Sequence, residues 1–418
     1  MTVTTTMRWP SIVRTPRAPL HATVARLVFE RAVSMVPVRV TTPDGEVRGG
    51  DATATAPEFR VVRPAAFFAR LGRDTKVGFG EAYMAGDWKA GEGTDLADLL
   101  TPFSARLTTL VPQPLQRLRG LVDQRIPAHH ENTPEGSREN ISAHYDLSND
   151  LFEAFLDPTM SYSAAWFGDD VDLTSATDLE AAQLRKIDGI LDYADVTEGT
   201  RLLEIGTGWG ALAVRAAQRG AKVTTVTLSA EQLALARRRA EQAGVAHLVD
   251  VRLQDYREVE GEYDAIVSVE MIEAVGEEYW PTYFTAIDRL LAPGGRVAIQ
   301  AITMSHERML VTRRSFGWIQ KYIFPGGLIP SLEAIDQTLV GHTSLRVTQR
   351  RELGPHYART LRLWRDRFTE NWPQIHDHGF DETFRRMWEF YLAYCEAGFR
   401  TGYLGVSQLQ LTRAPSWG

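Results

Sequence analysis

The chain has 418 residues, enough for about two domains, and its 44% hydrophobic and 24% charged residues are ordinary for a soluble globular protein. A single cysteine, Cys395, excludes a disulfide framework and a cysteine-based metal site, and no bound metal is expected. No run of 18 apolar residues is present, and the N-terminus lacks the apolar core of a signal peptide, so a cytoplasmic protein is predicted.

The net charge of −7 is unevenly distributed along the chain. Residues 1–140 carry 18 Lys and Arg against 15 Asp and Glu, and the remainder carries 28 against 38. The N-terminal surplus is either variation among solvated faces or the mark of a module that meets an anionic surface.

Residues 1–125 are predicted to form an N-terminal module of mixed helices and strands. Pro43-Asp44-Gly45 is a hairpin signal between two short strands. Residues 126–140 contain prolines and two histidines with little apolar content, which predicts a linker. The elements expected before the linker are helices at 21–36, 64–71 and 95–110 and strands at 38–42, 46–48 and 59–62.

From residue 141 onward, apolar strand patterns alternate with helical ones, which predicts an α/β domain. An aromatic segment at 315–324 interrupts this alternation. It either contributes to a core or forms a lid over an apolar substrate, and the lid is the favoured interpretation. Strands are expected at 202–205, 222–227, 249–253, 263–269, 294–302, 345–348 and 405–412, and helices at 178–191, 211–218, 230–243 and 280–291.

The strongest local signal is the turn Gly206-Thr207-Gly208-Trp209-Gly210, which follows a strand containing Glu204. A strand, a glycine turn and a helix N-terminus together present backbone N–H groups to a nucleotide-like ligand. The next strand ends in Thr227-Leu228-Ser229, without the acidic residue that a dinucleotide fold uses on its ribose. The third strand is followed by Gln254-Asp255-Tyr256, where an acid can accept from an adenine amine. This order favours S-adenosylmethionine over a nicotinamide cofactor.

Several separate motifs, in one order, resemble the cyclopropane fatty-acid synthases and their mycolic-acid-modifying relatives. The resemblance covers residues 141–418, and the segment around Glu81 resembles the N-terminal domain of the longer family members. The matching motifs are 144–147, Tyr162-Ser163, 206–210, 227–229 with Gln232, 267–273, 322–327, 356–361 and 395–400.

The resemblance implies an α/β, class I S-adenosylmethionine-dependent methyltransferase with a Rossmann-like, mostly parallel seven-stranded sheet whose last strand is antiparallel. It also implies a smaller N-terminal α+β domain at 1–125, associated with lipid or with oligomerisation, a linker at 126–140 and the methyltransferase domain at 141–418. Carried over by position, the residues that hold the cofactor are Tyr162, Ser163, Glu204, Gly206, Gly208, Thr227, Leu228, Gln232, Gln254, Asp255, Tyr256 and Val269.

The family transfers the sulfonium methyl group to the double bond of an acyl chain, usually within a phospholipid. A double bond is a poor nucleophile and must be held in line with the methyl group, and the carbocation then needs a dry pocket and a base. In the family this base is bicarbonate, held by a cysteine, a glutamate, a histidine and a tyrosine. Glu273 and Tyr357 match, but Ala164 stands at the cysteine position and Gln300 at the histidine position. A glutamine amide can still donate to a bicarbonate.

The altered set resembles the branch that makes methylene-bearing fatty acids, the precursors of 10-methyl branched, tuberculostearic-type chains. Glu273 and Tyr357, with Gln300 near them, are expected at the proton-removing centre. Glu270 is either an additional acid near this centre or a solvent-facing structural residue.

Three alternatives remain open: a cyclopropane-fatty-acyl-phospholipid synthase, a methyltransferase for a soluble small molecule, and a lipid-binding protein without catalytic activity. The aromatic segment speaks against the second alternative and the intact glycine turn against the third. The expected partners are a phospholipid with an unsaturated acyl chain and the inner face of a membrane, contacted peripherally, but no nucleic acid. A homodimer and a separate reductase for the methylene product are further candidates.

Overall fold

The computed structural model describes residues 9–17, 19–51, 53, 55–107 and 149–414. The chain divides into two compact units. Unit 1 holds the described residues up to 107 together with Arg314–Ile323 and Trp364–Tyr403, and unit 2 holds the other described residues. The predicted linker at 126–140 and the motif at 144–147 lie outside the described residues.

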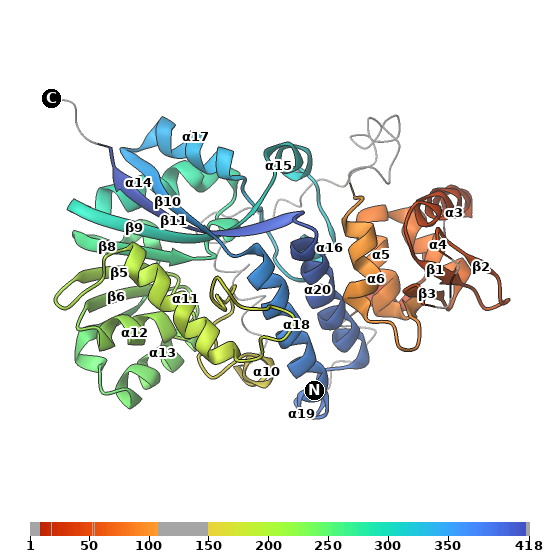
Figure 1. Ribbon diagram of the computed structural model, residues 1–418, viewed down its shortest axis with the longest axis horizontal. Coiled ribbons are helices and arrows are strands. Elements are labelled where there is room, and N and C mark those ends of the chain that lie inside the picture. Colours follow the sequence, from red (N-terminus) through yellow and green to blue (C-terminus); the bar gives the residue numbers. More distant parts are fainter. Residues whose placement is uncertain (1–8, 18, 52, 54, 108–148, 415–418) are drawn as a thin grey trace. The chain divides into compact units, whose positions relative to one another are not determined.

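Unit 2 is built on a seven-stranded sheet with the order β10-β11-β9-β8-β5-β6-β7 (Figure 1). The strands from β7 to β9 run parallel, and β11 is antiparallel to both of its neighbours. The predicted α/β fold class, with its mostly parallel sheet and antiparallel last strand, is confirmed. The strands are β5 (Arg201–Ile205), β6 (Lys222–Thr227), β7 (Val249–Leu253), β8 (Tyr263–Val269), β9 (Leu291–Met304), β10 (Leu345–Glu352) and β11 (Leu404–Arg413).

Helices cover both faces of this sheet (Figure 1). One face carries α11 (Leu179–Tyr193) and α12 (Ala211–Gln218), which share a core with Leu202 and Val223. Leu203, the next residue along β5, packs in the core of the opposite face. Because successive side chains of a strand point to opposite faces, a strand covered on both sides is apolar throughout.

The opposite face carries α14 (Trp280–Leu290) and α17 (Leu332–His342). The other helices that the structure describes in unit 2 are α10 (Asn149–Phe155), α13 (Ala230–Gln242), α15 (His306–Thr312) and the part of α18 (Gly354–Glu370) up to Leu363, with short 3-10 turns between them.

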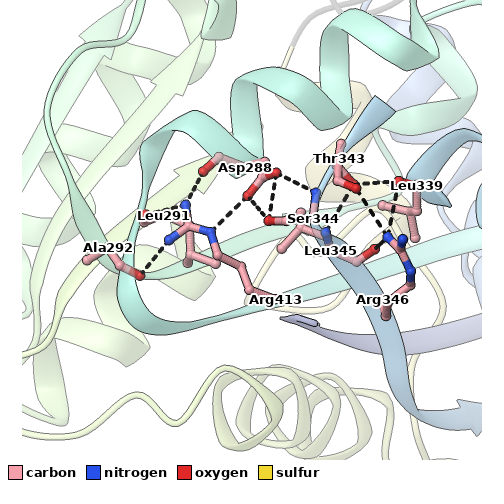
Figure 2. A network of polar contacts seen from close by, with 9 residues as sticks. All are labelled: Asp288, Leu291, Ala292, Leu339, Thr343, Ser344, Leu345, Arg346 and Arg413. Carbon is pink, nitrogen blue, oxygen red and sulfur yellow. Dashed lines mark hydrogen bonds and ion pairs between the residues drawn. The ribbon is translucent and has the colours of Figure 1, made fainter. Parts of the chain in front are cut away.

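A polar network fixes the end of β11 beside α14 (Figure 2). Arg413 donates to Oδ1 of Asp288 at 2.9 Å and to the carbonyl oxygen of Leu291 at 2.7 Å. Asp288 also accepts from the backbone N–H and the hydroxyl of Ser344, which directly precedes β10, at 2.8 and 2.9 Å. The two strands that extend the parallel sheet are therefore tied to a helix of its face.

Unit 1 contains a four-stranded sheet with the order β2-β1-β3-β4. The predicted hairpin is present as the antiparallel pair β1 and β2, and β1 also pairs with β3 in parallel. The strands are β1 (Arg39–Thr41), β2 (Val47–Arg48), β3 (Glu58–Val61) and β4 (Trp88–Ala90), and the helices are α2 (Pro10–Val13), α3 (Pro19–Ser34), α4 (Pro64–Arg73), α5 (Thr75–Ala85), α6 (Leu96–Ser104), α16 (Trp318–Tyr322), α19 (Trp372–Asp377) and α20 (Glu382–Arg400).

Aromatic residues from distant parts of the sequence form the core of unit 1. Phe59 and Trp88 stack with their ring centroids 4.4 Å apart. Phe390 of α20 packs edge-on against Trp88 at 6.2 Å and against Trp318 of α16 at 4.8 Å. The predicted domains are consecutive in the sequence, whereas unit 1 also contains α16 and α20 from the later part of the chain. These two helices belong to unit 1 because their aromatic side chains complete its core.

The aromatic segment at 315–324 is therefore largely part of a core. Trp318 is buried and donates from Nε1 to Sδ of Met84 at 3.4 Å, and Tyr322 donates to Oε1 of Glu81 at 2.6 Å. These contacts support the core interpretation of the segment over the lid.

Candidate active site

The glycine turn connects β5 to α12 through three residues in the left-handed region. Gly206, Gly208 and Gly210 have φ angles of 98°, 52° and 90°. A Cβ atom on Gly206 would lie 2.7 Å from Cγ of Met271, and one on Gly210 would lie 2.8 Å from Cβ of Ala236 in α13. A Cβ atom on Gly208 would meet no atom within 4 Å. The outer two glycines allow close packing, and Gly208 faces the space that a ligand can enter.

Glu204 is buried at the end of β5. Its Oε2 accepts from the hydroxyl of Thr225 at 2.6 Å, and Thr225 also donates to Oγ1 of Thr207 at 2.7 Å. Burial raises the pKa of Glu204 to about 8. The carboxyl group thus links the glycine turn to the adjacent strand β6.

The segments after β6 and β7 lie next to the turn, because these strands are neighbours in the parallel sheet. Thr227 donates to Oε1 of Gln232 at 2.8 Å, which connects the end of β6 to the first turn of α13. After β7, Asp255 forms an ion pair with Arg257 at 2.6 Å. The other predicted cofactor residues of these strand ends, Leu228, Gln254, Tyr256 and Val269, occupy the same edge of the sheet.

Tyr162 is joined to the turn through aromatic contacts. Its ring packs edge-on against Phe152 of α10 at 5.3 Å, and Phe152 packs against Trp209 of the turn at 4.8 Å. Trp209 donates from Nε1 to Oδ1 of Asn149 at 2.9 Å. The structure therefore brings Tyr162 close to the turn, as the motifs predicted.

Ser163 is held by two polar residues of α11 that the sequence analysis missed. Lys186 donates from Nζ to Oγ of Ser163 at 2.7 Å, and Gln183 donates from Nε2 to the Ser163 carbonyl oxygen at 2.9 Å. Burial lowers the pKa of Lys186 to about 8, although nearby Glu270 opposes this shift. The available signal was that Gln183 and Lys186 fall on the apolar face of the helix predicted at 178–191.

Glu270 lies at the centre of the predicted proton-removing site. Its Oε1 accepts from the backbone N–H of Ala164 at 2.9 Å and from Nε2 of Gln300 at 2.8 Å. Its Oε2 accepts from the hydroxyl of Tyr357 at 3.1 Å. Of the two interpretations of Glu270, the structure supports the additional acid near the site. Three of the four positions carried over from the family converge on this one carboxyl group.

Opposing effects act on the pKa of Glu270. Burial is the largest effect and raises the pKa of Glu270 above its ordinary value, although the hydrogen bonds from Ala164, Gln300 and Tyr357 and the charge of Lys186 oppose this rise. All three neighbours are donors to the carboxyl oxygens, so they favour its ionised form.

The amide of Gln300 is fully used. Its Nε2 donates to the carbonyl oxygen of Ala164 at 3.2 Å in addition to Glu270, and its Oε1 accepts from Nε2 of Gln408 at 3.1 Å. Gln408 lies directly opposite Gln300 in the pairing of β11 with β9. Two buried glutamines on adjacent strands therefore fix the orientation of the donor that faces Glu270.

Glu273 has a different environment from Glu270. Its Oε1 accepts from the backbone N–H of Ile302, and its Oε2 is buried without a hydrogen-bond partner among the residues that the structure describes. Burial, and then the charge of Glu270, raise the pKa of Glu273 to about 8. Tyr357 and Gln300 donate to Glu270, the acid that neighbours Glu273 at the predicted proton-removing centre. Burial raises the pKa of both carboxyl groups, but only Glu270 has several donors that stabilise its ionised form.

Comparisons with known proteins show the family of the chain. The family model described as mycolic acid cyclopropane synthetase matches residues 132–409. A tuberculostearic acid methyltransferase of Mycobacterium tuberculosis is 51% identical over 97% of this chain and 95% of its own length. A cyclopropane-fatty-acyl-phospholipid synthase of Escherichia coli is 35% identical over 85% of this chain and 88% of its own.

Among solved structures, a mycolic acid cyclopropane synthase in complex with SAH and CTAB has a TM-score of 0.59 at 32% identity. The match covers 66% of this chain and 97% of the chain of that solved structure. The family predicted from the sequence motifs is confirmed.

Proposed function

The chain belongs to the mycolic acid cyclopropane synthetase family, and from this premise we propose that it methylates the double bond of an unsaturated fatty acyl chain in a phospholipid and forms a methylene-branched product. The cofactor of this family is S-adenosyl-L-methionine. The observation that carries the methylene product is the altered site, in which Ala164 and Gln300 surround Glu270. The similarity to a tuberculostearic acid methyltransferase supports methylation of a fatty acyl chain.

The described residues fit this cofactor. The open space at Gly208 lets a ligand approach the backbone, and the strand ends with Thr227 and Asp255 lie beside it. Tyr162 and Ser163 complete the set that would hold the cofactor, which supplies an electrophilic methyl group. The protein's own contribution is to align the acyl chain with that methyl group and to exclude water from the resulting cation.

The two candidate products differ in one step. Addition of the methyl group to one carbon of the double bond leaves a cation on the other. In the methylene route, a hydride moves from the methyl-bearing carbon to the cationic carbon, and the added methyl group then loses a proton to give a terminal alkene. In the cyclopropane route, the methyl group loses its proton while its carbon bonds to the cationic carbon. The cyclopropane alternative is favoured by one observation, namely that Glu273 and Tyr357 both match the family's residues at the proton-removing centre.

Lipid analysis distinguishes these routes. The chain is expressed in a host with ordinary monounsaturated phospholipids, and the extracted lipid is examined by proton NMR. Terminal alkene protons, far downfield, are the expected result. Ring methylene protons alone, far upfield, would show a cyclopropane synthase. The absence of both signals would contradict both candidate products.

We also propose peripheral contact with a lipid surface through α3. Leu20, Val24 and Leu27 are 82%, 60% and 63% exposed, and their spacing places them, with exposed Arg31, on one face of the helix. An apolar stripe with a basic residue suits an anionic bilayer surface. No helix in the described part of the chain is long and apolar enough to cross a bilayer.

Two further partners stay predictions. A saturated methyl branch requires a separate reductase that acts on the methylene product. The second predicted partner is another copy of this chain, in a homodimer.

A further inference from the structure

We propose that Glu270 is the base that removes the proton from the methylated acyl chain, so that the protein works without bicarbonate. This inference rests on the proposed function and adds the group that completes the reaction. It assigns the base to Glu270, and not to Glu273 or to a bound anion.

The donors expected to hold bicarbonate are already used. The backbone N–H of Ala164, Nε2 of Gln300 and the hydroxyl of Tyr357 all donate to the Glu270 carboxyl group, at 2.8–3.1 Å. Gln300 has no further N–H to offer, because its second one bonds to the Ala164 carbonyl oxygen. The residues present do not fit a bicarbonate ion, since a planar carboxylate of the chain itself occupies the place that these donors define.

The backbone at this position supports a dedicated role. Glu270 has a φ of 49°, a conformation that costs a side-chain-bearing residue roughly 1–2 kcal/mol. The backbone N–H of Glu270 donates to the carbonyl oxygen of Gln300 at 2.7 Å, which helps to hold it there. Such strained residues persist where the surrounding structure fixes them, and they cluster at active sites. Here the strain directs a carboxyl group into a ring of three donors.

The environments of the two acids separate their roles. Burial raises the pKa of both acids, but only the carboxylate of Glu270 is stabilised against this effect by three hydrogen-bond donors and the charge of Lys186. Glu273 accepts one backbone hydrogen bond, its Oε2 has no partner among the described residues, and it faces the negative charge of Glu270. Glu270 is therefore the acid whose ionised form the surrounding donors stabilise. In the proposed step, a C–H bond of the added methyl group breaks and its electrons form the new double bond with the cationic carbon. The proton passes to Glu270 and is released to water between turnovers.

The test uses the purified full chain with vesicles of monounsaturated phosphatidylglycerol, in buffer stripped of carbon dioxide and in the same buffer with added bicarbonate. We expect equal rates in both buffers and no heat when bicarbonate is titrated into the complex with S-adenosylhomocysteine. Glu270→Gln should lower the rate on the order of a hundredfold, the usual scale for a positioned proton-transfer group, and more than Glu273→Gln does. Bound S-adenosylhomocysteine, measured by calorimetry, shows that each variant is folded.

Glu270→Gly provides a sharper variant. Glycine is relaxed at this φ, and its lack of a carboxyl group leaves the three donors free for an added ion. We expect this variant to bind bicarbonate and to recover activity with it, which Glu270→Gln does not.

Bicarbonate binding to the unmodified protein, a rate that falls in stripped buffer, or a Glu270→Gln rate within tenfold of the unmodified protein would overturn the inference. Failure of the proposed function has a different signature, namely no methyl transfer to the acyl chain in either buffer.

Discussion

Lys186 donates from Nζ to Oγ of Ser163 over 2.7 Å, although both side chains are buried. Burial raises the pKa of the two acids Glu204 and Glu270, and the positive charge of Lys186 opposes this rise in both. One side chain thus connects the cofactor segment with the group that we assign as the base.

Replacing Lys186 with methionine should move the pH dependence of the reaction. Without the positive charge, the pKa of Glu270 rises, so a higher pH is needed before the base is ionised. The midpoint of the acidic limb of the pH–rate profile is therefore expected to shift upward. Lys222→Met, at an exposed lysine of β6, is the matched control. Coincident midpoints for the Lys186 variant and the unmodified protein would contradict the argument.

Substitution of Gly208 should abolish cofactor binding with little change in fold. A Cβ atom there meets no protein atom within 4 Å, so the main effect of a side chain falls on the ligand. Gly208→Val also strains a φ of 52°, whereas asparagine tolerates this region better. We expect both Gly208→Val and Gly208→Asn to lose binding of S-adenosylhomocysteine in calorimetry. An asparagine variant with unchanged affinity would show that the cofactor does not lie against this residue.

Glu273 should make thermal stability depend on pH in a predictable direction. Its pKa of about 8 lies above the ordinary value of 4.5, so the folded state binds more protons between these pH values. The stability contributed by the neutral form is present below pH 4.5 and is lost as the pH rises through 8.

Glu273→Gln lacks this dependence. The melting temperature of the variant, relative to that of the unmodified protein, should therefore rise between pH 5 and 9. Glu278→Gln, at an exposed position nearby, is the control. If the melting temperatures of the Glu273 variant and the unmodified protein changed in parallel with pH, the Glu273 carboxyl group would not have a raised pKa in the folded protein.

The apolar stripe of α3 should determine binding to anionic vesicles. Fully burying an aliphatic side chain contributes roughly 1.5–3 kcal/mol, so changing Leu20, Val24 and Leu27 together to serine should weaken vesicle binding at least tenfold. Val340→Ser, at an exposed residue of α17, is the control. Equal cosedimentation of the triple variant and the unmodified protein would exclude this surface.

Surface substitutions test this contact better than a truncation. A chain that starts near residue 138 would lack Trp88, against which Phe390 of α20 packs. Loss of vesicle binding by such a chain would then reflect a damaged core as much as a missing surface.

The sequence predicted the sheet of unit 2 well because its signals are local. The strands at 222–227, 249–253 and 263–269 are confirmed within their predicted bounds, since each is a short run rich in Val, Ile, Leu or Thr that is closed by a turn. β9 is longer than the predicted 294–302, because pairing with β11 continues to Met304. The helix predicted at 95–110 ends at Ser104 in α6, and its last three predicted residues, 108–110, lie outside the described part.

The arrangement of the site was less predictable because it depends on contacts between distant segments. Glu270 contacts Ala164, Gln300 and Tyr357, which lie in three segments far apart in the sequence: a loop, β9 and α18. A glutamate in a left-handed conformation has no local sequence signature, so its role was left open between two interpretations. The return of α16 and α20 to unit 1 was missed for the same reason, since aromatic spacing marks an apolar face but not its neighbour.

The composition of unit 1 also constrains how the protein is made. Its N-terminal strands and helices leave the ribosome early, yet Phe390, which closes the aromatic core around Trp88, is synthesised some three hundred residues later. Until α20 emerges, Phe59 and Trp88 lack part of their cover, and exposed aromatic surface of this kind promotes aggregation of nascent chains. Unit 2 does not share this delay to the same degree, because β5 to β8 follow one another directly in the sequence. We therefore expect the middle of the chain to acquire its fold during translation before its beginning does.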